Sequence, residues 1–93
     1  MDYVVGIDPG SKGGFAVINK ETHKVKYIKE FSNDKEIIIK FLKEAREFAD
    51  IVYLEKAISV STNRTICNNL FFINGFITGV AECLGYEVLR FHP

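Results

Sequence analysis

Two short apolar runs in this sequence each end directly in an acidic residue. The first covers residues 3–7 and is followed by Asp8, and the second covers residues 51–54 and is followed by Glu55. Short apolar runs bounded by turn signals are typical of buried strands, and Pro9-Gly10 is such a signal. We therefore expect two strands that both carry an acid at their C-terminal end.

The rest of the chain predicts further strands. An apolar run at residues 15–18 follows Gly13-Gly14, and residues 25–31 alternate between two faces after a polar turn. Because only short turns connect these runs, we expect them to form an antiparallel meander with the first strand. Residues 86–91 predict a last strand.

Helices are predicted between the later strands. Asn33, with Glu36 three residues later, is typical of a helix cap. Apolar residues recur behind it at helical spacing, namely Ile37, Ile38, Phe41, Leu42, Ala45, Phe48 and Ala49. A second helix is predicted over residues 63–84, with Gly85 ending it at the C′ position.

The second predicted helix has two apolar stripes. One comprises Ile66, Leu70, Ile73, Ile77, Val80 and Leu84, and the other comprises Phe72, Phe76 and Cys83. The sheet would cover one stripe, and a further helix or a second subunit, approaching closely at Gly75 and Gly79, would cover the other. The pattern predicts a homodimer through the 63–84 helix, with core packing alone as the alternative.

The expected order of elements is β-β-β-α-β-α-β. It combines an antiparallel meander with crossover helices that return the chain parallel to the sheet. At 93 residues and 47% hydrophobic content, the chain suits one domain with its own core. We therefore expect an α/β fold with a mixed sheet.

Composition restricts the classes of partner and compartment. Twelve basic and twelve acidic residues give a formal charge of +0, so nucleic-acid binding has to depend on a local site. Cys67 and Cys83 lie in one predicted helix, roughly 24 Å apart, which is too far for a disulfide. Free thiols suit a reducing cytosol, and no export signal opens the chain. The apolar stretch at residues 70–84 is shorter than the roughly 20 residues that span a bilayer, so we expect a cytoplasmic protein without a membrane segment.

The two strand-end acids predict a metal site. If their strands are parallel neighbours, the C-terminal ends lie about 4.8 Å apart, and Asp8 and Glu55 face one another. Two carboxylates this close repel unless a cation lies between them, and hard oxygen ligands suit Mg²⁺ or Mn²⁺. Such ions polarise phosphates and activate water, so both acids are candidate catalytic and metal-binding residues. Taken singly, Asp8 could cap its turn and Glu55 could simply mark the chain emerging into water.

Polar residues in the loops beside these acids are candidates for phosphate contact. Nucleic-acid-binding residues are expected among cations and hydroxyls there, and the candidates are Ser11, Lys12, Lys56 and Arg64. Ordinary loop polarity is the alternative.

These segments resemble the RuvC-type Holliday-junction resolvases of the RNase H-like superfamily. The resemblance lies in Val4-Val5-Gly6-Ile7-Asp8-Pro9-Gly10-Ser11, in Gly14-Phe15-Ala16-Val17-Ile18 and in Val52-Tyr53-Leu54-Glu55-Lys56-Ala57. It implies an RNase H-like mixed sheet, a bacterial or phage origin, and a structure-specific endodeoxyribonuclease. It also implies hydrolysis of phosphodiester bonds in branched or duplex DNA with Mg²⁺ or Mn²⁺. The substrate structure, DNA or RNA, and the metal itself stay open.

The resemblance also implies a segment that this sequence does not contain. The family completes its acidic cluster from a final helix beyond the fifth strand, and the sequence given ends at His92-Pro93. We therefore expect residues 1–93 to be a C-terminally truncated RNase H-like nuclease domain that is inactive by itself. A shortened protein that has lost half of the site is the alternative.

Other functions remain as alternatives. Actin-like and sugar-kinase ATPases also open with a strand, an acid and a glycine-rich turn, although Glu55 favours the nuclease. A P-loop is excluded because Gly10-Ser11-Lys12 does not have the required spacing. A non-catalytic interaction module with the same fold is the third candidate.

Overall fold

The computed structural model describes residues 1–10, 13–32, 34–55 and 64–91, with the backbone alone for residues 64–71. The expected order of elements is confirmed. The elements are β1 (Tyr3–Asp8), β2 (Gly14–Asn19), β3 (Val25–Glu30), α1 (Lys35–Ala45), β4 (Ala49–Glu55), α2 (Arg64–Cys83) and β5 (Glu87–Phe91).

All strands of the described chain join one mixed sheet in the order β3-β2-β1-β4-β5. The meander pairs β1 with β2 and β2 with β3 antiparallel, whereas β4 is parallel to both β1 and β5. Tight turns allow the antiparallel pairs, and each parallel pair needs a crossover helix. The predicted α/β mixed sheet, with β1 and β4 as parallel neighbours, is therefore confirmed.

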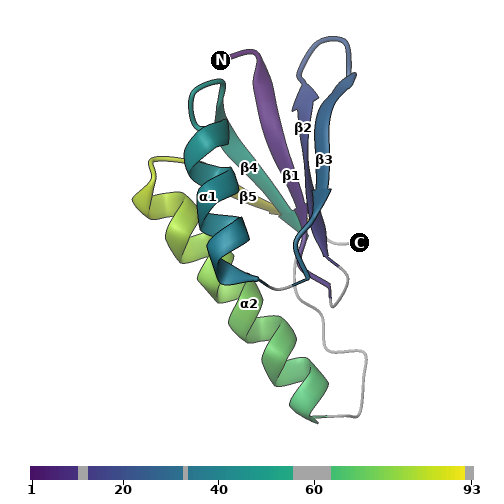
Figure 1. Ribbon diagram of the computed structural model, residues 1–93, viewed down its shortest axis with the longest axis vertical. Helices are drawn as coiled ribbons and strands as arrows, with labels where there is room; N and C mark the ends of the chain where they lie inside the picture. Colours follow the sequence, from purple (N-terminus) through teal and green to yellow (C-terminus); the bar gives the residue numbers. More distant parts are fainter. Residues whose placement is uncertain (11–12, 33, 56–63, 92–93) are drawn as a thin grey trace.

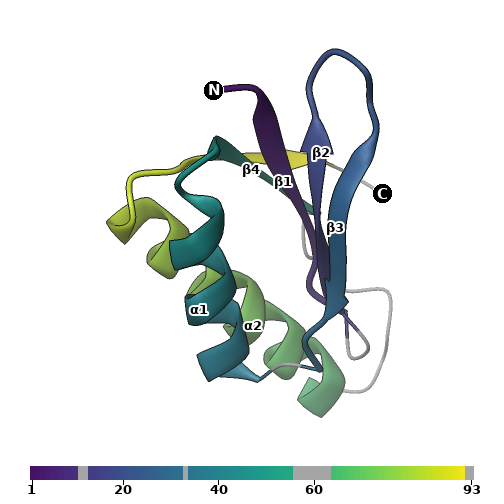
Figure 2. The same cartoon turned by 45° about the horizontal axis from the view of Figure 1, so that its top comes forward.

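Both helices lie on the same face of the sheet (Figures 1 and 2). Residues from alternate sheet positions and from one side of each helix form the core beneath them: Val5, Ile7, Phe15, Val17, Phe31, Ile38, Phe41, Leu42, Ala45, Ala49, Val52, Leu54, Ile73, Ile77, Ala81 and Tyr86. Neither helix covers the opposite face, where Ile28, Tyr53 and Phe91 are exposed. The sheet thus has one buried face and one open face.

The N-terminus of α1 differs from the prediction. The N-cap is Asp34, whose Oδ1 accepts hydrogen bonds from the backbone N–H groups of Glu36 and Ile37 at 3.0 and 3.2 Å. Asn33 lies outside the described residues. Asparagine and aspartate cap helices about equally well, so the spacing of Asn33 and Glu36 did not exclude a cap one residue later.

The C-terminus of α1 also differs from the prediction. The helix ends at Ala45, and Ala49 is the first residue of β4, paired with Tyr3 of β1. Phe48 packs edge-on against Tyr3, with ring centroids 5.8 Å apart. Apolar spacing alone could not show this boundary, because a residue buried by the sheet and one buried by a helix look alike in sequence.

Gly85 ends α2, as predicted. Its φ is +91°, and a Schellman pair of hydrogen bonds joins Gly85 N to Glu82 O and Tyr86 N to Ala81 O, each at 3.0 Å. Tyr86 was predicted to begin the last strand, but β5 begins at Glu87. The Tyr86 hydroxyl instead donates to Leu42 O at 2.6 Å, and burial raises the pKa of Tyr86 to about 12.

The contrast between the two faces predicts a contrast in stability. Leu42 is 0% exposed and Ile28 is 68% exposed. Leu42→Ala should lower the free energy of unfolding by about 2–5 kcal/mol because it leaves a cavity. Ile28→Ala should change it by less than about 0.5 kcal/mol. Urea unfolding measures both, and equal losses would contradict the one-sided core.

Candidate functional site

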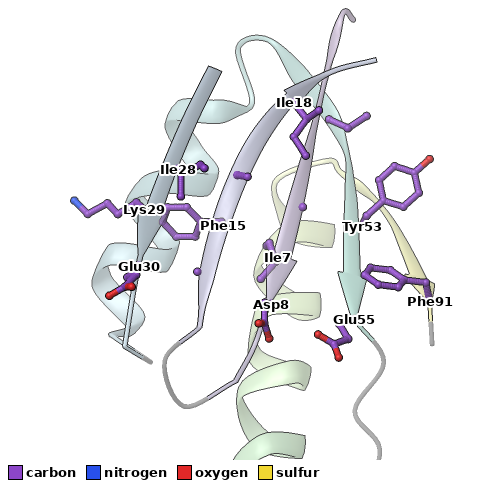
Figure 3. Close-up of a pocket in the computed structure, with 14 residues that line it drawn as sticks. Ile7, Asp8, Phe15, Ile18, Ile28, Lys29, Glu30, Tyr53, Glu55 and Phe91 are labelled. Carbon is purple, nitrogen blue, oxygen red and sulfur yellow. The ribbon is translucent and has the colours of Figure 1, made fainter. Parts of the chain in front are cut away.

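Asp8 and Glu55 end β1 and β4, and the parallel register brings them together. Ile7 pairs with Leu54, so the next residue along each strand is an acid. Figure 3 shows the two carboxylates side by side at the same edge of the sheet. The charge of Asp8 acts on Glu55, and the two carboxyl groups lie within hydrogen-bonding reach when one of them is protonated. The sheet therefore places the predicted pair side by side.

The turn after β1 holds Asp8. Gly10 N donates to Asp8 Oδ1 at 3.1 Å, which closes a local turn and leaves Oδ2 free of that bond. A Cβ on Gly13 would lie 2.4 Å from Asp8 O and 2.7 Å from Gly10 O. Any side chain at position 13 would therefore push the loop away from the acid. Sequence reasoning treated Gly13 only as a marker preceding the second strand.

A buried amide holds the end of β4. Asn74 of α2 donates from Nδ2 to the backbone carbonyl of Glu55 at 3.0 Å. The apolar stripes of residues 63–84 do not include Asn74 and do not predict this contact. The signal that could have found it is a polar residue on the sheet-facing side of a helix, since buried amides need a partner.

The electrostatics of the pair penalise two negative charges. The pKa of Glu55 is raised above its ordinary value, first by partial burial, then by the charge of Asp8 and by their hydrogen bond. Carboxylates this close either share a proton or need a cation. The pair is therefore suited to hold a positive ion.

A groove of about 550 Å³ runs over the open face of the sheet and ends at the acids (Figure 3). Small residues of the central strands, Gly6, Gly14 and Ala16, lie between larger ones on either side. Its full lining is Val4, Gly6, Ile7, Asp8, Gly14, Phe15, Ala16, Ile18, Ile28, Lys29, Glu30, Tyr53, Glu55 and Phe91. The charged residues in this lining are Asp8, Glu55, Lys29 and Glu30.

The donor set fits a hard divalent cation. Carboxylate oxygens are the ligands that Mg²⁺ and Mn²⁺ prefer. Within the described ranges, no third histidine, cysteine, aspartate or glutamate joins the pair as a cluster. The pair could supply two carboxylates to an ion, and water or a phosphate would have to supply the rest.

The other predicted site residues are not placed by the structure. Ser11, Lys12 and Lys56 lie outside the described residues, and so does the side chain of Arg64, the first residue of α2. Their contact with nucleic acid stays a prediction. Cys83 is an exposed free thiol, as predicted. In the part of the chain that is described, no helix is long and apolar enough to cross a membrane.

Solved structures of RuvC are similar to this chain in fold. Thermus thermophilus RuvC in complex with a Holliday-junction substrate superposes with a TM-score of 0.79 at 16% identity over 100% of this chain. The chain has a RuvC-like fold. A second Thermus thermophilus RuvC structure gives a TM-score of 0.68 at 20% identity over 98% of the chain. No family model and no curated protein matches.

The chain spans 66% and 64% of the lengths of these two RuvC chains. At these identities the likeness establishes the RNase H-like fold with its mixed sheet. The RuvC-like fold includes both strands that carry the acids, Asp8 and Glu55, because the superposition covers essentially the whole chain.

The contact between the acids predicts a coupled titration. Asp8→Asn should lower the pKa of Glu55 toward its ordinary value, since it removes the negative charge beside Glu55. Folded Glu55 has the higher pKa, so its stabilising contribution is present at acidic pH and is lost as the pH rises through the folded pKa. Asp8→Asn should reduce this loss. Carbon-13 NMR of the carboxyl groups and urea unfolding at several pH values measure both effects.

Glu30→Gln is the matched control, because Glu30 lines the same groove but does not contribute to the shift at Glu55. An unchanged Glu55 titration in Asp8→Asn would show that the two carboxyl groups do not interact.

Proposed function

We propose that this chain provides the nuclease domain of a resolvase-type endonuclease that hydrolyses phosphodiester bonds in branched DNA with a divalent metal. The observation that carries the proposal is the contact of Asp8 with Glu55 at adjacent strand ends of a RuvC-like sheet. A raised pKa at a strand-end carboxyl beside a groove is typical of a functional site.

Asp8 and Glu55 would hold the metal, Mg²⁺ or Mn²⁺. A bound ion of this kind polarises a phosphate and lowers the pKa of a water. The protein's part is positional: the Gly10 N–H fixes one oxygen of Asp8, and the Asn74 amide fixes the backbone of Glu55. Ser11, Lys12, Lys56 and Arg64 would bind the DNA backbone around the acids. Ser11 and Lys12 follow the turn after β1, Lys56 follows Glu55 directly, and Arg64 begins α2 after the segment that follows β4.

Two carboxylates hold Mg²⁺ weakly, because this ion keeps most of its water unless its geometry is nearly ideal. The proposed reaction therefore needs further carboxylates. We propose that a helix following β5 provides them, as the RuvC resemblance implies.

The proposal predicts a conditional activity. Residues 1–93 alone should not cleave a four-way DNA junction. A version extended by such a helix should cleave it in Mg²⁺ or Mn²⁺, and Asp8→Asn or Glu55→Gln should each slow cleavage by at least about 100-fold, or ~2.7 kcal/mol. Single-turnover assays on labelled junctions measure the rates. Both substitutions keep the side-chain size and remove the charge that the metal needs.

The same assays distinguish the alternatives. An extended protein that cleaves equally well with both acids neutralised would exclude this mechanism. Junction binding without cleavage under any condition would favour the non-catalytic interaction module. Saturable ATP binding with no affinity for junctions would favour the ATPase fragment.

We also propose a homodimer through α2. Phe72 is 60% exposed on this helix, with the Lys35 ammonium 4.6 Å from its ring centroid. A Cβ on Gly75 or Gly79 would meet nothing within 4 Å, so this side of α2 is open to close approach. Exposed apolar residues beside small ones are typical of an interface.

Gly79→Arg should convert the dimer to monomer, because a long charged side chain would block this approach. It should leave the helix intact, since arginine favours helix over glycine by about 1 kcal/mol. Sedimentation equilibrium measures the change. Ile28→Lys is the control on the open sheet face. A monomeric parent chain, or dissociation by Ile28→Lys alone, would contradict the α2 interface.

A further inference from the structure

Asn74 is the buried polar side chain among the described residues, with 7% of its surface exposed. It lies on α2 beside Ile73 and one turn from Ile77, both of which are buried in the core. Burying an amide without a hydrogen-bond partner is unfavourable. An apolar residue would pack equally well at this position. The hydrogen bond of Asn74 is therefore what distinguishes an asparagine here from an apolar residue.

The amide of Asn74 bonds outside its own helix. Its Nδ2 donates to Glu55 O at 3.0 Å, at the last residue of β4. Thr78 Oγ1 donates to Asn74 O at 2.9 Å, one turn further along α2, and Arg90 of β5 donates to Thr78 Oγ1 at 2.8 Å. A chain of hydrogen bonds therefore connects β5 through α2 to the acidic end of β4.

The hydrogen bond of Asn74 is to the backbone of Glu55, the same residue whose carboxylate lies at the end of the groove. Val52 and Leu54 are 0% exposed beneath the helices, and the alternation of a strand turns Tyr53 and Glu55 to the groove. Asn74 thus holds the Glu55 carbonyl from the helix side while the Glu55 side chain points to the other face, toward Asp8 (Figure 3). Fixing the backbone at this carbonyl restricts where the carboxylate can lie.

We propose that Asn74 is a positioning residue for the acid pair: its amide holds the end of β4 so that the Glu55 carboxylate stays opposite Asp8. The inference rests on the proposed function for its metal consequence, because groups that orient metal ligands set metal affinity. Thr78 and Arg90 tie β5 to the same helix but do not contact Glu55.

The experiment compares Asn74→Leu with Thr78→Val in the 93-residue chain. Asn74→Leu removes the donor and keeps the branching and the number of side-chain heavy atoms, and Thr78→Val removes the two Thr78 bonds while leaving the Asn74 amide in place. Three-bond NMR couplings report the side-chain rotamer of Glu55 without metal. Paramagnetic broadening of the Asp8 and Glu55 carboxyl signals by Mn²⁺ reports metal affinity. Urea unfolding verifies that each variant is folded.

Asn74→Leu should average the Glu55 rotamer and weaken Mn²⁺ binding by about tenfold, the lower end for groups that orient a ligand. Thr78→Val should leave both unchanged. A folded Asn74→Leu with the parental rotamer and Mn²⁺ affinity would overturn the proposal, and so would equal losses in Thr78→Val. If Asn74→Leu does not fold, Asn74→Ala, which also lacks the donor and is smaller, is judged by the same two readouts.

Asp8→Asn and Glu55→Gln separate this inference from the proposed function. If neither weakens Mn²⁺ broadening, the metal site is wrong, and the rotamer of Glu55 still decides the role of Asn74. If both weaken it while Asn74→Leu changes neither the Mn²⁺ broadening nor the Glu55 rotamer, the metal site stands and the positioning role is excluded.

Discussion

The parallel pairing of β1 with β4 is the constraint on which the site depends. Burial of Val5, Ile7, Val52 and Leu54 against the helices holds the two strands in one register. A shift of one residue would expose these side chains and turn one acid to the helix side, because strand side chains alternate between faces. The apolar positions thus place the polar pair, and the core determines where the two carboxylates meet.

The closeness of Asp8 and Glu55 lowers the stability of the fold when both groups are ionised. Partial burial and the charge of Asp8 both raise the pKa of Glu55, so ionising both groups opposes folding. Local rules of stability are typically broken at functional sites and offset elsewhere. Here the core between the helices and the other face of the sheet offsets the electrostatic cost of the acid pair. Neither Asp8 nor Glu55 is part of this core.

The two faces of the sheet carry different features: the core lies on one and the groove on the other. Both helices cover one face and enclose the core, and α2 also brings Asn74 to the end of β4. The other face carries the groove with the acids at its end. The sheet therefore separates most of the residues that form the core from the acids and the groove beside them.

The order and type of the elements follow from the sequence by itself, because apolar periodicity and turn residues act locally. Asp8 and Glu55 could be recognised for the same reason, since each follows an apolar run directly. Two boundaries could not be recognised in this way. The N-cap at Asp34 was missed because asparagine and aspartate cap helices about equally well, and the entry of Ala49 into β4 depends on packing against the sheet.

Contacts between residues distant in the chain were decided by the tertiary structure alone. Asn74 lies outside both apolar stripes of the sequence, and only the packing of α2 on the sheet gives it Glu55 as a partner. The physical reason is that a hydrogen bond between elements depends on how they are placed, and local patterns do not encode that placement.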